Sequence, residues 1–213
     1  MIIAIDGPAA AGKGTLARRL ADRFGLALLD TGLLYRAVGA KVTSLGQDPS
    51  DTDVAVAAAR DLASEDLGDE ALRGDAAAEA ASKVAAIPRV REVLLDFQRN
   101  FARNPPGGAS GAVIDGRDIG TVVCPDAEIK FFITADVEIR AERRLKELQD
   151  RGLEAIYGRV LRDMKGRDAR DSGREVAPLE PADDAHRIDT GDLDADGVFA
   201  AALGFIETQD RSG

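Results

Sequence analysis

Short apolar runs alternate along the chain with longer segments in which apolar residues recur at helical spacing. Five runs predict buried strands, at 2–6, 26–30, 112–115, 128–133 and 186–189. Helices are predicted at 13–24, 33–44, 51–64, 75–85, 88–103, 136–151, 153–167 and 193–209. Strands that alternate with helices indicate an α/β fold, in which helices flank a parallel sheet.

Most of the predicted strands end on polar residues. The polar positions are Asp6, Asp30 with Thr31, the segment 115–118, and Thr134 with Asp136. Open parallel sheets bind ligands at the carboxyl ends of their strands. We therefore expect the functional site along this edge of the sheet.

The loop after the first strand has the pattern of a phosphate-binding loop, called the P-loop below (residues 7–15). Gly7 and Gly12 allow a tight turn, Lys13 supplies a positive charge, and backbone N–H groups at the start of the next helix face an anion. Gly14 separates Lys13 from Thr15, so the strict pattern is missed by one place. A plain Gly/Ala-rich turn is the alternative, but the full combination favours nucleotide binding. The predicted ATP-binding residues are Gly7, Pro8, Ala9, Ala10, Ala11, Gly12, Lys13, Gly14 and Thr15.

The composition limits the class of protein. A chain of 213 residues with 45% apolar residues suits one domain with a small inserted piece. No apolar run approaches the length of a membrane helix, and the chain starts directly on a core strand, so we expect neither a membrane span nor a signal peptide. A lone Cys124 and a lone His186 exclude an internal disulfide and a Cys/His metal cluster. We expect a cytoplasmic protein, with Cys124 as a core residue.

The charge is unevenly distributed. A net charge of −10 argues against a broad nucleic-acid surface. Residues 48–79 hold ten Asp/Glu against two Arg, whereas residues 140–174 hold eleven Lys/Arg against seven Asp/Glu. The basic region suits either a small anionic ligand or a solvated helix face with local ion pairs, and charge alone leaves both open.

Further arginines follow the second and third strands. Thr31 could cap a helix, while Tyr35 and Arg36 would face the same crevice as the P-loop. Two glycines flank the pair Arg117 and Asp118 at the end of the third strand. A P-loop with several separate arginines suggests two phosphate-bearing ligands and phosphoryl transfer. Such a kinase must exclude water, and the basic helices around 136–174 are the candidate lid.

Six segments together resemble one family. They are 7–15, 29–36, 81–91, 115–123, 167–171 and 177–179. In this order, over nearly the whole chain, they resemble the bacterial cytidylate kinases (CMP/dCMP kinases), which are nucleoside monophosphate kinases. The resemblance implies a P-loop kinase fold and an enzyme that phosphorylates CMP and dCMP with ATP and Mg²⁺. The segment Gly116 to Val123 is the part of the sequence that points to this family in particular.

The resemblance also implies roles for individual residues. Ser82, Arg91 and Asp118 would read the cytosine edge, with Asp118 accepting a hydrogen bond from the exocyclic amine that uracil lacks. Thr15 would lie near Mg²⁺. The implied catalytic residues are Lys13, Arg140, Arg143, Arg144 and Arg170. The implied CMP-binding residues are Thr31, Tyr35, Arg36, Ser82, Arg91, Arg117, Asp118, Arg167, Asp171 and Arg174, of which Arg167 and Asp171 would hold the sugar and Arg36, Arg117 and Arg174 the phosphate.

Two subregions follow from the resemblance: an insert that binds the monophosphate (residues 37–95) and the lid (residues 137–175). The family pattern has a longer, partly β insert before residue 81, whereas the stretch 45–80 is short, acidic and alanine-rich, and we expect it to be helical. We expect a monomer without nucleic-acid or membrane partners. Another small-molecule kinase, of the adenylate or shikimate type, and a nucleotide-gated binding protein are the alternatives.

Overall fold

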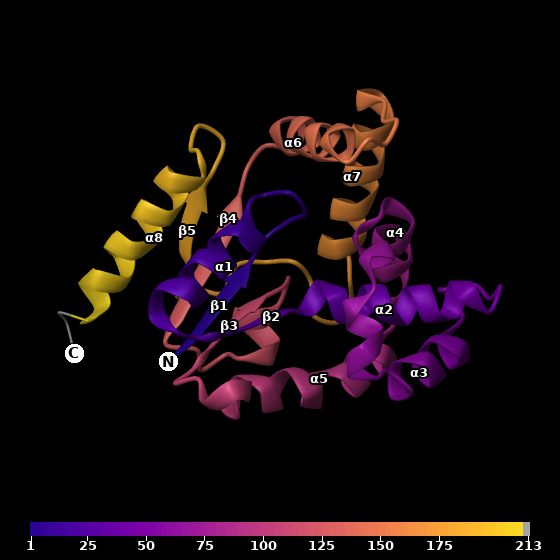
Figure 1. Ribbon diagram of the computed structural model, residues 1–213, viewed down its shortest axis with the longest axis horizontal. Helices are drawn as coiled ribbons and strands as arrows, with labels where there is room; N and C mark the ends of the chain where they lie inside the picture. Colours follow the sequence, from indigo (N-terminus) through magenta and orange to yellow (C-terminus); the bar gives the residue numbers. More distant parts are fainter. Residues whose placement is uncertain (211–213) are drawn as a thin grey trace.

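A computed structural model describes residues 1–210, except for the side chains of residues 64, 65, 73 and 210. Its sheet has five parallel strands in the order β2-β3-β1-β4-β5 (Figure 1). The strands are β1 (Ile2–Asp6), β2 (Ala27–Asp30), β3 (Ala112–Asp115), β4 (Ile129–Thr134) and β5 (His186–Asp189). The runs are apolar on both sides because helices cover both faces of the sheet. The predicted α/β fold is confirmed.

Eight α-helices lie in the described part of the chain, close to the predicted positions. They are α1 (Lys13–Phe24), α2 (Thr31–Ser44), α3 (Thr52–Arg60), α4 (Asp75–Val84), α5 (Pro88–Arg103), α6 (Val137–Asp150), α7 (Tyr157–Ser172) and α8 (Ala195–Asp210). The largest difference concerns α7, which begins four residues later and ends five residues later than predicted. Gly152 has a φ of 73° and helps to close the turn after α6. At the other end, ion pairs from Arg167 and Arg174 to Asp171 stabilise a last turn that contains little apolar sequence.

Four short helical turns complete the chain, and sequence periodicity predicted none of them as separate elements. Three are 3₁₀ turns, at Ser64–Gly68, Glu70–Arg73 and Pro106–Gly108. The first of these shows that the predicted helix 51–64 ends early, at Arg60. The fourth is a π-helix at Ile119–Val123, directly after the Arg117–Asp118 pair.

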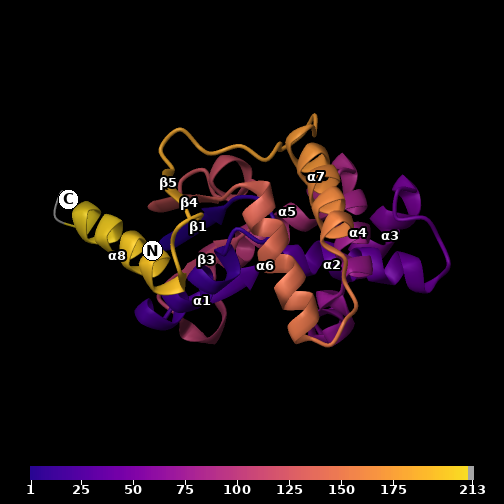
Figure 2. The same ribbon diagram turned by 90° about the horizontal axis from the view of Figure 1, so that it is seen from above.

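Helices pack on both faces of the sheet (Figures 1 and 2). On one face, Leu16 and Leu20 of α1 and Ala202 of α8 join an apolar core with Ile5 and Phe131. On the other face, the core is formed by α5, the π-helix and alternate residues of β1 and β3, among them Ala4, Ile114, Ile119 and Ala102. Cys124 belongs to this second core, which confirms its prediction as a core residue. Both cores leave the carboxyl ends of the strands free for a site.

The insert has an apolar core of its own, formed by α2, α3, α4 and the start of α5. The short stretch before residue 81 is helical, as predicted, and contributes α3 and the 3₁₀ turns. Helices α2 and α4 approach closely at Gly39, where a Cβ would lie 2.8 Å from the Cβ of Ala80. The residues that α2 and α4 carry are therefore held in a fixed relation to each other.

The lid is a pair of helices, α6 and α7, joined by a small apolar cluster that includes Leu148 and Met164. Helix α7 lies beside α4 in both views, so the lid and the insert are in contact (Figures 1 and 2). The subregions 37–95 and 137–175, as a monophosphate-binding insert and a lid, stay predictions; α3 and α4 lie within the first, and α6 and α7 within the second. That the two subregions move, and that the chain forms one domain, stay predictions.

No helix in the described part of the chain is both long enough and apolar enough to cross a membrane.

Gly39→Ala tests the close packing of α2 on α4. Alanine is favoured over glycine in a helix, but the added Cβ would overlap backbone and side-chain atoms of Ala80, at 2.9 and 2.8 Å. We expect the free energy of unfolding, measured with urea, to fall by about 1–3 kcal/mol. Gly204→Ala is the matched control, because a Cβ on Gly204 of α8 meets no atom within 4 Å; it should raise stability by about 0.5–1 kcal/mol. Equal effects of the two changes would contradict this packing.

Candidate active site

The P-loop connects β1 to α1 in a conformation that depends on its glycines. Gly7 has a φ of 141°, and a Cβ there would lie 1.9 Å from the carbonyl oxygen of Ile133 in β4. Gly12 has a φ of 97° and forms the N-cap of α1 without any side-chain hydrogen bond to the helix. The first backbone N–H groups of α1 are therefore not satisfied by a capping side chain, which is the arrangement that binds phosphate.

Lys13 lies inside the loop beside a carboxylate. Its Nζ donates to the carbonyl oxygen of Pro8 at 2.9 Å and lies 3.9 Å from Oδ1 of Asp115. Burial, with the positive charge of Arg117, lowers the pKa of Lys13 to about 8. Burial and the negative charge of Asp30 raise the pKa of Asp115 to about 6, although the positive charge of Lys13 lowers it. Asp115 was not among the predicted site residues, although its place at the end of a buried strand was a usable signal.

Two of the predicted lid arginines contact the P-loop region. Arg140 is 5% exposed, donates to the carbonyl oxygens of Ala135 and Ala9 at 2.8 and 3.3 Å, and pairs with Asp168 of α7 at 2.6 Å. Arg143 donates to Oγ1 of Thr190 at 2.8 Å, and this hydroxyl donates to the carbonyl oxygen of Ala11 at 3.0 Å. The start of α6 is thus fixed to the P-loop.

A cavity of about 200 Å³ lies between these groups and α8. It opens beside the start of α1, so it adjoins the phosphate-binding N–H groups. Its lining combines P-loop atoms, the Arg143 guanidinium and apolar side chains: Ala11, Gly12, Thr15, Leu16, Arg143, Thr190, Leu193, Asp194, Ala195 and Val198. Thr15, which was predicted to lie near a metal ion, has its side chain exposed at the edge of this cavity.

The other two lid arginines contact the insert. Arg144 forms ion pairs with Asp75 at the start of α4 and with Glu147 of its own helix. The Nε of Arg170 donates to Oγ of Ser82 at 3.1 Å. In this conformation Arg144 and Arg170 join the lid to α4, and Arg140 and Arg143 join it to the P-loop. The structure therefore divides the four predicted catalytic arginines into two pairs.

A second polar group lies between the insert and the end of β3. Arg91 of α5 forms a buried ion pair with Asp118, and its guanidinium lies 5.4 Å from the ring centre of Tyr35. Asp118 is 4% exposed and Ser82 is 2% exposed. Residues predicted to read a base are thus buried polar groups with defined partners.

Three predicted arginines surround the carboxylate of Asp171, and a fourth, Arg36, lies close to them. Asp171, which is 1% exposed, accepts from Nε of Arg117 at 3.1 Å, pairs with Arg174 and lies 3.8 Å from Nε of Arg167. Burial raises the pKa of Asp171, but the three arginines outweigh it and hold the pKa below its usual value. Arg36 donates instead to the carbonyl oxygen of Leu72 at 2.7 Å.

This arginine cluster (Arg36, Arg117, Arg167 and Arg174) carries four positive charges, and a single carboxylate, that of Asp171, pairs with three of them. Burial lowers the pKa of Arg167 to about 9 and lowers that of Arg36 and Arg174, with neighbouring arginines adding to the effect. The Nε atoms of Arg167 and Arg174 are buried and have no hydrogen-bond partner. Buried donors without partners are costly, and an anionic ligand would satisfy them.

Thr31 does not cap α2, so that interpretation was wrong. Asp30 is the N-cap, and its side chain accepts from the N–H of Gly32 at 2.9 Å. Thr31 is 3% exposed and donates to the carbonyl oxygen of Asp115 at 2.8 Å, which joins α2 to the end of β3. Because Asp30 caps the helix, the hydroxyl of Thr31 is available to connect the start of α2 to the end of β3.

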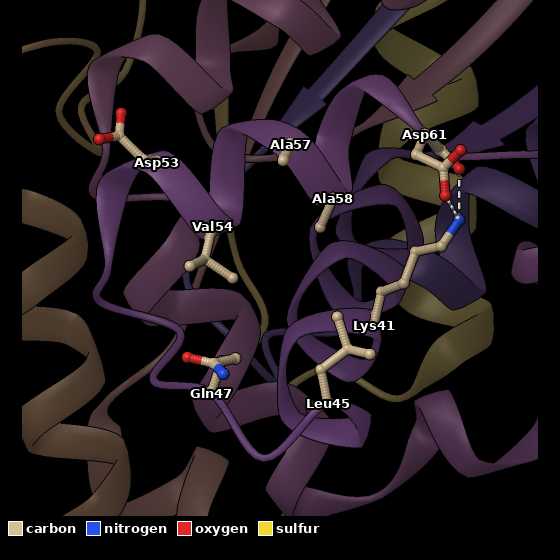
Figure 3. A pocket seen from close by; sticks show the side chains of 8 residues that line it. All are labelled: Lys41, Leu45, Gln47, Asp53, Val54, Ala57, Ala58 and Asp61. Atoms are coloured by element: carbon tan, nitrogen blue, oxygen red, sulfur yellow. Dashed lines mark hydrogen bonds and ion pairs between the residues drawn. The ribbon is translucent and has the colours of Figure 1, made fainter.

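A larger cavity, of about 690 Å³, lies away from these groups on the insert (Figure 3). It is formed between the end of α2 and α3, and Lys41 crosses its rim to pair with Asp61 at 3.0 Å. The other lining residues are Leu45, Gln47, Asp53, Val54, Ala57 and Ala58. No predicted site residue lines it, so it is not part of the candidate active site.

Known proteins match the chain over nearly its full length. The cytidylate kinase family model matches residues 3–208. A protein of Paramagnetospirillum magneticum named cytidylate kinase is 67% identical over 205 residues, which cover 96% of this chain and 97% of that protein. Proteins with the same name are 60% identical in Rhodospirillum rubrum, with 97% of both chains covered, and 57% identical in Methylocella silvestris, with 98% and 94% covered.

A solved structure supports the fold. An uncharacterized protein from Eubacterium ventriosum is 16% identical and superposes with a TM-score of 0.58 over 98% of both chains. The alignments cover nearly all of this chain and of the named relatives, so the relatives have about the same length. With a family model that spans the sheet, the insert and the lid, the chain belongs to the cytidylate kinase family.

Proposed function

We propose that this protein transfers the γ-phosphoryl group of ATP to CMP and dCMP, giving CDP and dCDP. The observation that carries the proposal is the proximity of two anion-binding groups. The charges of Arg117 and Arg167 lower the pKa of Lys13, so the arginine cluster lies within electrostatic range of the P-loop. Phosphoryl transfer between two phosphate-bearing substrates requires two such groups side by side.

ATP would bind with its phosphates on the P-loop. The free N–H groups at the start of α1 and the ammonium group of Lys13 suit the β- and γ-phosphates. The cavity beside the loop would take the base, because it combines apolar side chains such as Leu193 with the planar guanidinium of Arg143.

The residues beside the P-loop fit a magnesium ion. The described residues contain no group of three His, Cys, Asp or Glu side chains that could enclose a metal. Mg²⁺ in kinases needs no such group, since phosphate oxygens and water supply most of its ligands. The hydroxyl of Thr15 would hold the ion, and the carboxylate of Asp115 lies close to the same loop. When bound, Mg²⁺ would neutralise charge on the phosphates.

CMP would bind between the insert and the end of β3. The carboxylate of Asp118 accepts hydrogen bonds only, so it matches the exocyclic amine of cytosine and not the carbonyl oxygen of uracil. Ser82 and Arg91 would contact the remaining polar edge of the base. Because these groups are buried, an unmatched base would leave them without partners.

The arginine cluster would take the phosphate of CMP. In the structure, Asp171 supplies the negative charge that holds Arg117, Arg167 and Arg174 together. A phosphate would satisfy the buried Nε atoms of Arg167 and Arg174 and leave Asp171 free to accept from a sugar hydroxyl. The accepting oxygen is already anionic, so the reaction needs no general base.

The lid would complete the site by excluding water and by bringing its arginines to the transferred group. Arg140 and Arg143 already contact the P-loop region, which supports their assignment. Arg144 and Arg170 would have to exchange their contacts with Asp75 and Ser82 for contacts with the nucleotide. A monomer, a cytoplasmic location, a role in pyrimidine metabolism and the lack of nucleic-acid partners stay predictions.

Asp118→Asn, assayed against a panel of acceptors, tests the function and the base pocket together. The unmodified protein with Mg-ATP should form ADP with CMP and dCMP, and far less with UMP, AMP or GMP. Asparagine can donate to the carbonyl oxygen of uracil, so the variant should lose roughly 10- to 100-fold in kcat/KM for CMP and gain relative preference for UMP.

The control is Asp126→Asn, which removes the same charge from an exposed position close along the chain. It should leave all acceptors unchanged, and neither change should affect the KM for ATP. Turnover of AMP or UMP but not CMP by the unmodified protein would contradict the proposed function. An equal loss for ATP and CMP in Asp118→Asn would place the base elsewhere.

The lowered pKa of Lys13 predicts an unusual pH dependence. Lysine loses its charge as pH rises, so kcat/KM for ATP should fall as pH rises through about 8, well below the 10.5 of an ordinary lysine. In Lys13→Arg the rate should be lower, but the decline between roughly pH 7.5 and 8.5 should disappear, because an arginine loses its proton at a higher pH than a lysine in the same place. An unmodified protein whose profile is flat to pH 10 would contradict this prediction.

Asp171→Ala tests whether Asp171 supplies the anion for the arginine cluster. The variant leaves three arginines with less compensation, so its free energy of unfolding should fall by about 3–5 kcal/mol. Phosphate or sulfate should restore part of the loss, whereas chloride at equal ionic strength should not. In the control, Asp163→Ala removes an exposed contact to Arg159 in the same helix and should change stability little. A variant that responds equally to both kinds of salt would rule out a specific anion site.

A further inference from the structure

A buried carboxylate at the end of β1 is not used by the proposed reaction. Asp6 is 3% exposed, and none of the described lysine and arginine side chains forms an ion pair with it. Its Oδ1 accepts from the N–H of Ile119 and its Oδ2 from the N–H of Gly120, both at 2.7 Å. Both donors belong to the first turn of the π-helix that follows Asp118.

This contact replaces an ordinary helix cap. Asp118 occupies the N-cap position of the π-helix, and an aspartate there normally accepts from the first N–H groups of its own helix. Here Asp118 forms no such bond, because its carboxylate is directed to Arg91. The N–H groups that it leaves are satisfied by Asp6 from a different strand.

We propose that Asp6 is a positioning residue that caps the π-helix in place of Asp118 and so keeps the Asp118 carboxylate available for the acceptor base. The inference rests on the proposed function and deepens it. Asp6 directly precedes Gly7, so the same residue also fixes the spacing between the P-loop and the segment that reads the acceptor. In the proposed function, Asp6 would contact neither nucleotide.

The surroundings of Asp6 destabilise its ionised carboxylate. Burial and the charges of Asp118 and Asp115 together raise the pKa of Asp6 to about 7, although the two N–H bonds lower it. Lys130 lies nearby against Gly120, but its ammonium group pairs with Asp184. Cys124 is the remaining titratable neighbour, and burial raises its pKa as well. Since no cation compensates Asp6, the N–H bonds account for its retention.

Asp6→Asn tests the proposal, because an amide can accept from one N–H group but would present its own N–H₂ to the other. We expect the KM for CMP to rise about 10-fold and the preference for CMP over UMP to fall, while the KM for ATP stays within about two-fold. Direct titration of CMP onto the protein should show the same loss of affinity. Asp126→Asn is the matched control for charge and should change neither KM.

The pH profile gives a readout that a purely structural role would not move. A protonated Asp6 resembles asparagine, so kcat/KM for CMP should fall in the unmodified protein as pH drops below about 7. The phosphate of CMP titrates at about pH 6, and the pKa of Asp115 is also about 6. The comparison is therefore with Asp6→Asn, in which only these two contributions should remain.

Gly120→Ala perturbs the same contact from the other side, since its Cβ would lie 3.4 Å from Oδ2 of Asp6. This variant should also raise the KM for CMP, and it provides the test if Asp6→Asn does not fold. The proposal is overturned if the KM values for ATP and CMP rise together, if the KM for CMP is unchanged in a folded variant, or if neither variant folds. Absence of CMP turnover in the unmodified protein would instead contradict the proposed function.

Discussion

The burial of positive charge at the carboxyl edge of the sheet is the constraint on which the site depends. Arg117, Arg167 and Arg174 come from two distant parts of the chain and would repel one another without an anion. Asp171 provides that anion in the free protein and thereby joins α7 to the end of β3. Because a buried charge is stable only when it is compensated, a phosphate bound as in the proposed function would take over the compensation that Asp171 provides.

The lid and the insert are joined by polar side chains. Arg170 of α7 donates to Ser82 of α4, and Arg144 of α6 pairs with Asp75 at the start of α4. These contacts are possible because the insert is short and helical, so that α4 lies directly beside α7 (Figure 2). The free protein therefore has polar contacts between α4 and the helices α6 and α7, and under the proposed function a nucleotide would replace them.

The sequence predicted the strands, the helices and the P-loop well, because their signals are local. Apolar runs set the strands, and the glycine, lysine and hydroxyl spacing set the loop. The contacts of Asp6 and Asp115 were not predicted, because the partner of each carboxylate lies more than a hundred residues away in the sequence. The π-helix also gave no periodic signal, because one short turn of Ile119–Val123 reads as a loop. The division of the lid arginines between P-loop and insert depends on packing that no spacing encodes.

The close packing at Gly39 has a consequence for the length of the acceptor. Helix α2 carries Arg36, which would bind the phosphate in the proposed function, and α4 carries Ser82, which would contact the base. The contact of Gly39 with Ala80 sets the separation between these two side chains. A side chain larger than glycine at position 39 would overlap Ala80, so this separation depends on Gly39. In the proposed function, an acceptor without a phosphate would leave Arg36 without its anion, and an acceptor with two phosphates would extend past it. Preference for a monophosphate would then come from the packing of two helices as well as from the charged side chains.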